Sequence, residues 1–206
     1  MDINDLLQGP MKDIIIDQVG KQLGIGDSQQ TNTAIDGIFA TLLNGVMKNT
    51  NTPEGQTGLM NALERDHDGS ILDDLAGFLG GGKAPSNPKT ANGEGILNHL
   101  LGDKTANAAE SISKVSGIDT AKIMQLMATL APVVLGMLGK AKAQPQVEQS
   151  SGGLLDFIKG ATQTVNQQPA NQSILNSLLD KDGDGSIIDD IAGMGMKSIF
   201  GKLFGK

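Results

Sequence analysis

An acidic segment interrupted by glycine occurs twice in this chain, and this repeat constrains the fold more than any other feature. Residues 62–77 read ALERDHDGSILDDLAG, and residues 178–193 read LLDKDGDGSIIDDIAG, so a shift of 116 positions aligns them. Aspartates, the Gly-Ser pair and the final Ala-Gly pair coincide. An internal repeat of this kind indicates two related structural units.

Helical periodicity dominates the rest of the chain. Apolar residues recur three and four positions apart between Ile35 and Met47, which predicts a helix with one buried stripe. Asp27 and Asp119 each precede such an apolar run and suit the N-cap position. No segment keeps the period of two that is typical of a half-buried strand. We therefore predict an all-α, multihelical fold.

The repeat divides the chain into two tandem, related helical units, each ending in an acidic helix-loop-helix segment. The first unit is predicted to span residues 1–82 and the second residues 94–206. Residues 83–93 form the predicted linker, because Gly, Pro, Asn and Ser dominate this region and stop regular structure.

Composition restricts both the core and the partners. The chain has no Cys, Trp or Tyr, whereas Met occurs 9 times and Gly 28 times, which indicates closely packed helices with an aliphatic core. A formal net charge of −7 argues against nucleic acid as a partner, since nucleic-acid affinity depends on Lys and Arg. The absence of cysteine removes thiolate chemistry and fits a cytoplasmic protein.

Two apolar segments raise the question of membranes. The segment Ile123–Gly139 contains Gln, Thr and Pro and is short for a membrane span, so we predict a buried central helix, kinked or restarted at Pro132. The tail, Met196–Lys206, mixes apolar residues with lysines and could lie on a membrane surface. Docking onto the protein's own core or onto a partner is the favoured interpretation, and membrane association is not expected.

Three segments together resemble a known family. They read NTPEGQTGLMNALERDHDGSILDDLAGFLGG, GEGILNHLLGDKTANAAESISKVSGID and LMATLAPVVLGMLGKAK. They resemble the YidB-like bacterial family, catalogued as domain of unknown function 937, over about residues 20–140. The resemblance implies an all-helical fold and carries no established activity.

The second acidic segment has the pattern of a calcium loop. Ca²⁺ prefers several oxygen ligands, which alternating carboxylates on a tight turn supply. Counted from Asp180, the positions of three aspartates, Gly185 and a backbone carbonyl match the first part of an EF-hand loop. The EF-hand Glu at position 12 is replaced by Ile191, so a neighbouring Asp would have to complete the site. The predicted calcium ligands are Asp180, Asp182, Asp184, Ser186, Asp189 and Asp190.

The first acidic segment is the weaker copy, because Glu64 replaces the leading Asp and His67 replaces a small residue. Its candidate ligands are Glu64, Asp66, Asp68, Ser70, Asp73 and Asp74. The alternative interpretation of the repeated pattern is a turn before a capped helix, with Ser186 and Asp189 forming a cap in the second segment.

Catalytic patterns are missing from the sequence. His67 and His99 do not form a zinc pattern, and we predict that His67 is solvated whereas His99 is a core or capping residue. Neither GxSxG nor GxxxxGK[ST] occurs, so we predict no catalytic residues. We expect a non-enzymatic helical protein that binds Ca²⁺ and acts as a structural or protein-interaction module, with a protein partner or self-association. A peripheral membrane protein and an uncharacterised hydrolase remain alternatives.

Overall fold

The structure is a computed structural model that describes residues 9–82, 87–148 and 153–179 of the 206-residue chain. Within these ranges every regular element is helical, which confirms the predicted all-α fold. The second acidic segment and the tail lie outside the described residues.

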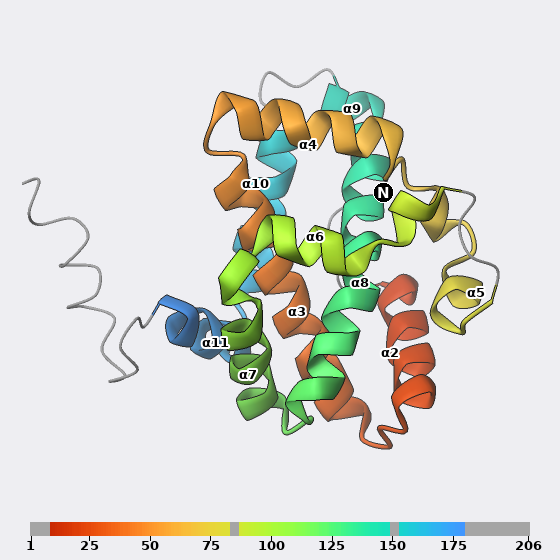
Figure 1. The fold of residues 1–206 in the computed structure, drawn as a ribbon, viewed down its shortest axis with the longest axis vertical. Coiled ribbons are helices and arrows are strands. Elements are labelled where there is room, and N and C mark those ends of the chain that lie inside the picture. Colours follow the sequence, from red (N-terminus) through yellow and green to blue (C-terminus); the bar gives the residue numbers. More distant parts are fainter. Residues whose placement is uncertain (1–8, 83–86, 149–152, 180–206) are drawn as a thin grey trace, which may run out of the picture.

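Helices account for most of the described chain (Figure 1). The α-helices are α2 (Pro10–Leu23), α3 (Ser28–Asn49), α4 (Pro53–Arg65), α5 (Leu75–Leu79), α6 (Gly93–Leu100), α7 (Thr105–Ser116), α8 (Thr120–Lys142), α9 (Pro145–Glu148), α10 (Gly153–Asn166) and α11 (Pro169–Leu179). The 3-10 helices among the described residues are η1 (Ser70–Leu72), η2 (Pro88–Ala91) and η3 (Gly102–Lys104).

The helix α3 occupies the centre of the fold (Figure 1). Residues 34–43 are all buried, so this part of the helix has no solvated face. The predicted helix is present, but the prediction that only one stripe of it is buried was wrong for these residues. The reason is tertiary, because α2, α7, α8, α10 and α11 all pack against α3.

The prediction of a buried helix in the most apolar segment is confirmed by α8. This helix is long and apolar enough to cross a membrane, but 67% of its most apolar window is buried inside the structure. It contacts α3, α6 and α7, and it forms the second central helix of the fold.

Pro132 was predicted to kink or restart this helix; it lies inside α8 and the helix continues through it, so the restart does not occur. A proline in a helix leaves the carbonyl four residues earlier without its usual backbone donor. That carbonyl belongs to Ala128, and Gly93 at the start of α6 packs so closely against it that an added Cβ would collide. A proline in one helix and a glycine in the other therefore meet at the α6–α8 contact.

Buried side chains from both predicted units form one hydrophobic cluster. The cluster runs from Ile15 in α2 to Ile174 in α11, and α3 contacts helices on both sides of the predicted linker. Part of the linker is itself folded, since the buried Thr90 in η2 donates a hydrogen bond to the carbonyl oxygen of Asp66 at 2.6 Å. Among the described residues, the segment 83–93 therefore does not separate two cores.

Both predicted N-caps are confirmed. The carboxylate of Asp27 accepts a hydrogen bond from the backbone N–H of Gln29 at 2.8 Å, at the start of α3. The carboxylate of Asp119 accepts one from Ala121 at 2.9 Å, at the start of α8. Each cap satisfies backbone donors that the first turn of a helix leaves free.

Candidate functional site

The first acidic segment connects α4 to α5 and packs directly against the C-terminal part of α8. Gly69 has a φ of 96°, which favours glycine, and a Cβ there would press against Lys140. Gly139 of α8 lies against the carbonyl oxygen of His67 with no room for a Cβ. Two glycines thus bring the loop backbone and α8 into close contact.

Two carboxylates of this segment pair with lysines of α8. Asp73 Oδ1 lies 3.1 Å from Lys140 Nζ, and Glu64 pairs with Lys142. The hydrogen bond and the charge of Lys142 lower the pKa of Glu64. One carboxylate before the turn and one after it are therefore each matched by a cation from the same helix.

Two further carboxylates are engaged by polar groups of nearby residues. Asp66 accepts a hydrogen bond from the side-chain amide of Asn87 at 3.0 Å. Asp68 accepts one from the backbone N–H of Ser70 at 3.0 Å. Hydrogen bonds from the Ser70 hydroxyl and from its backbone N–H lower the pKa of Asp68.

The remaining carboxylate caps a helix. Asp74 precedes α5 and accepts a hydrogen bond from the backbone N–H of Gly77 at 3.0 Å. Ser70 instead begins η1, so the serine cap expected at Ser186 in the second segment has no counterpart in the first. In the first segment the helix cap is therefore provided by an aspartate, Asp74, and not by the serine.

The carboxylates of the first segment do not converge on one point. Across the described residues, no group of three or more His, Asp or Glu side chains is placed to hold a metal ion. The candidate ligands with these separate partners are Glu64, Asp66, Asp68, Ser70, Asp73 and Asp74. The other candidate ligands, which lie outside the described residues, are Asp180, Asp182, Asp184, Ser186, Asp189 and Asp190.

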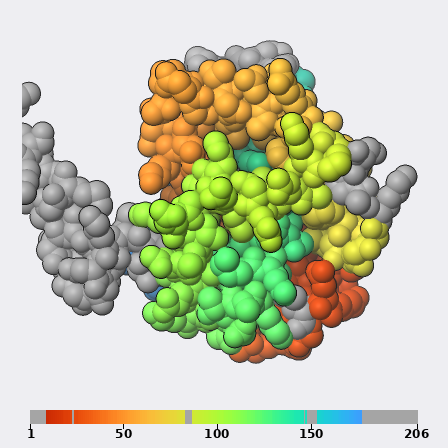
Figure 2. All heavy atoms as spheres, in the orientation of Figure 1, coloured from red at the N-terminus to blue at the C-terminus, as the bar shows by residue number. Residues whose placement is uncertain are grey.

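A pocket of about 450 Å³ opens between α4 and α6, and we call it the histidine pocket. Figure 2 shows it as a hollow between these two helices with α8 at its base. Its ionisable lining residues are His67, His99 and Lys89, and no Asp or Glu lines it. Its large apolar lining residues are Val46, Leu59, Ile96, Leu100 and Leu135.

The structure reverses the environments predicted for the two histidines. His67 is only 5% exposed, whereas His99 is exposed. Burial lowers the pKa of His67, and the neighbouring carboxylates of Asp66 and Asp68 partly oppose this effect. Local polarity does not indicate this burial, because α3, α6 and α8 surround the pocket in addition to the adjacent α4. Nδ1 of His67 has no hydrogen-bond partner in the structure.

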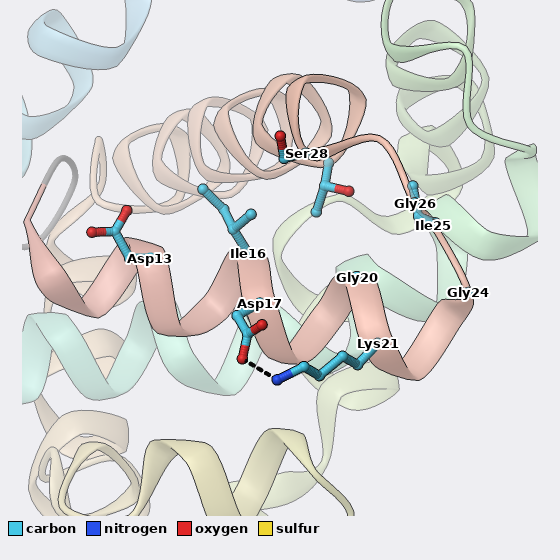
Figure 3. A pocket seen from close by; sticks show the side chains of 10 residues that line it. Asp13, Ile16, Asp17, Gly20, Lys21, Gly24, Ile25, Gly26 and Ser28 are labelled. Carbon is cyan, nitrogen blue, oxygen red and sulfur yellow. Dashed lines mark hydrogen bonds and ion pairs between the residues drawn. The ribbon is translucent and has the colours of Figure 1, made fainter.

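A second hollow lies where α2 turns into α3, and Figure 3 shows it from close by. It is larger, about 610 Å³, but it is a shallow surface groove. Its charged residues include Asp17 and Lys21, which are exposed and pair with each other at 2.6 Å. The histidine pocket is the more enclosed of the two and is lined by His67, whose buried Nδ1 has no hydrogen-bond partner.

Comparisons with known proteins identify the family and add no activity. Searches of curated proteins and of solved structures found no match. A family model matches residues 5–141, which is more than half of the chain and includes the helices from α2 through most of α8. The resemblance expected from the sequence is thereby confirmed, and the chain belongs to the family described as bacterial protein of unknown function, DUF937.

Proposed function

We propose that this protein is a non-enzymatic helical module whose acidic loops fix the positions of helices, and that Ca²⁺ occupies the second loop. The observation that supports this role is the way in which the first loop is held. Lysines of α8 pair with Glu64 and Asp73, so the protein itself supplies positive charge to an acidic loop.

Acidic side chains in a short loop repel one another unless nearby positive charge or hydrogen-bond donors offset the repulsion. The second loop carries five Asp within residues 180–190 and has alternate aspartates followed by Gly185. This is a closer match to a calcium loop than the first segment, in which Glu64 and His67 break the pattern. We propose that Ca²⁺ supplies to the second loop the positive charge that lysines supply to the first.

A loop held in this way suits a structural or protein-interaction role. An ion that binds only the folded state stabilises that state by mass action, by about 2.7 kcal/mol at a free concentration of 100 times Kd. Fixed helices then present a constant surface to a protein partner or to a second copy of the chain. A cytoplasmic location remains part of the proposal, because the chain contains no cysteine.

Thermal unfolding of the full chain in Ca²⁺ and in chelator tests the proposal. We expect Ca²⁺ to raise the Tm, and we expect Asp182→Ala/Asp184→Ala to remove most of that rise. The matched control is Asp66→Ala/Asp68→Ala, which makes the same change in the first loop. This control should keep the rise even if its Tm in chelator is lower.

Two results would overturn calcium binding at the second loop. One is the absence of any shift in Tm at millimolar Ca²⁺. The other is a shift that survives the change at Asp182 and Asp184 but is lost in the control variant.

Analytical ultracentrifugation in Ca²⁺ and in chelator then measures self-association, which is one form of the proposed interaction role.

A further inference from the structure

The histidine pocket combines an apolar interior with one buried polar atom that lacks a partner. His67 lines the pocket and is 5% exposed, and its Nδ1 has no hydrogen-bond partner. Buried polar atoms in folded proteins are nearly always satisfied, by protein, water or a ligand. Because Nδ1 itself is buried, the ionisable groups that a bound molecule would meet in the pocket are those of the exposed lining residues Lys89 and His99.

The ionisable side chains that line the pocket are all basic, whereas the carboxylates of Asp66 and Asp68 lie close to His67 without lining the pocket. Lys89 and His99 are exposed and line the pocket, whereas acidic residues are missing from its lining. Within the described part of the chain, Lys89 has no ion-pair partner. A cation next to an apolar cavity favours a ligand with a negatively charged end.

The size and the wall of the pocket suit a small molecule. Its volume of about 450 Å³ lies within the range of roughly 300–1,000 Å³ that is common for such sites. Its outer wall, α4, is lightly packed, since Leu63 is its one buried residue. A helix with so few buried contacts is displaced from the fold more easily than a core helix, and such a displacement would widen the entrance of the pocket for a ligand.

We propose that the histidine pocket binds a linear, mainly apolar molecule with a single carboxylate, of the size of a medium-chain alkanoate. The chain of the ligand would lie among Leu59, Ile96 and Leu135, and its carboxylate would lie near Lys89. This site does not depend on calcium, so its tests are run in chelator and can fail separately from those of the acidic loops.

Isothermal titration of the full chain with octanoate, below the concentration at which it forms micelles, tests the site. Ala62 of α4 lines the pocket, and Ala62→Phe should lower the affinity for octanoate at least about tenfold by filling it. The matched control is Asn61→Phe, which adds the same side chain at an exposed neighbour that does not line the pocket. It should leave the affinity unchanged.

The carboxylate is tested with two analogues of the same length. Lys89→Gln should weaken octanoate by about two- to fivefold, as expected for an exposed charge pair, and should leave 1-octanol unaffected. Octylamine should bind more weakly than either. Octylamine that binds as tightly as octanoate would overturn the proposed charge preference.

Nuclear Overhauser contacts in the unsubstituted chain keep the test independent of how the variants fold. Contacts between the octanoate chain and the methyl groups of Ile96 and Leu135 would support the site. No binding at millimolar octanoate, or binding with contacts elsewhere, would overturn it. Equal affinity of Ala62→Phe and Asn61→Phe, with both variants shown to be folded by circular dichroism, would do the same.

Discussion

Lys12 Nζ in α2 lies 2.6 Å from Asp36 Oδ1 in α3, and the two side chains are only 10% and 11% exposed. Burial raises the pKa of Asp36, and the hydrogen bond and charge of Lys12 oppose the rise without cancelling it. This pair joins the first described helix to the central one, so it is a sensitive point for stability.

Removing only the lysine should be costly. Lys12→Met leaves Asp36 buried without its cation, and we expect the free energy of unfolding at neutral pH to fall by about 3–5 kcal/mol. The double variant Lys12→Met/Asp36→Leu removes both charges and should regain most of this loss. Urea unfolding measures both. A double variant as unstable as the single one would show that the unpaired charge is not the cause.

The same pair should give a pH dependence of defined sign. Because the pKa of Asp36 is raised above 3.8 in the folded state, the folded chain binds this proton more tightly than the unfolded chain. The stabilisation of the folded state by this proton is fully present below the pKa of Asp36 in the unfolded chain. It is lost as the pH rises through the pKa of Asp36 in the folded chain. In Lys12→Met the lysine no longer opposes the rise, so the stability deficit against the parent chain should shrink from about pH 7 to about pH 4. Urea unfolding measures this difference across the pH range. A difference in free energy of unfolding that did not change with pH would show that titration of Asp36 is not its cause.

Two glycine-to-alanine changes should have opposite effects. Gly139→Ala places a Cβ against the carbonyl oxygen of His67, and we expect a loss of about 1–3 kcal/mol in the free energy of unfolding. Gly58→Ala, inside α4, adds a Cβ that meets nothing within 4 Å. It should stabilise the protein by up to about 1 kcal/mol, because alanine favours the helix. Equal effects in urea unfolding would mean that the loop does not pack on α8 as described.

The lysines of α8 should control the order of the first acidic loop. In Lys140→Gln/Lys142→Gln we expect faster hydrogen exchange of backbone amides in residues 66–74 and unchanged exchange in α3. The control is Lys114→Gln, which removes a lysine that pairs with Glu110 within α7. Unchanged exchange in the loop of the double variant would show that these ion pairs do not hold it.

Features that depend on neighbouring residues could be predicted from the sequence. The caps at Asp27 and Asp119 follow from a short polar side chain before an apolar run, and the burial of α8 follows from its composition. The partners of the acidic loop could not be predicted in this way. Lys140 lies 67 positions after Asp73, and Lys142 lies 78 positions after Glu64. Nothing local indicates that these pairs meet.

The histidines show the same limit. His67 stands among acidic residues, a setting typical of a solvated loop, yet the packing of other helices around the loop buries it. His99 has apolar neighbours in sequence, yet its own position on α6 is exposed. Local polarity therefore predicted the wrong environment for both, because burial here depends on which helices pack together.

The proposed difference between the two acidic loops is tested most directly by a calcium titration of the full, isotope-labelled chain, followed through backbone amide signals. The predicted result is a set of saturable changes in signals from residues 180–190, with signals from residues 64–74 unchanged. Changes in residues 64–74 alone, or no changes in either loop at millimolar Ca²⁺, would contradict it.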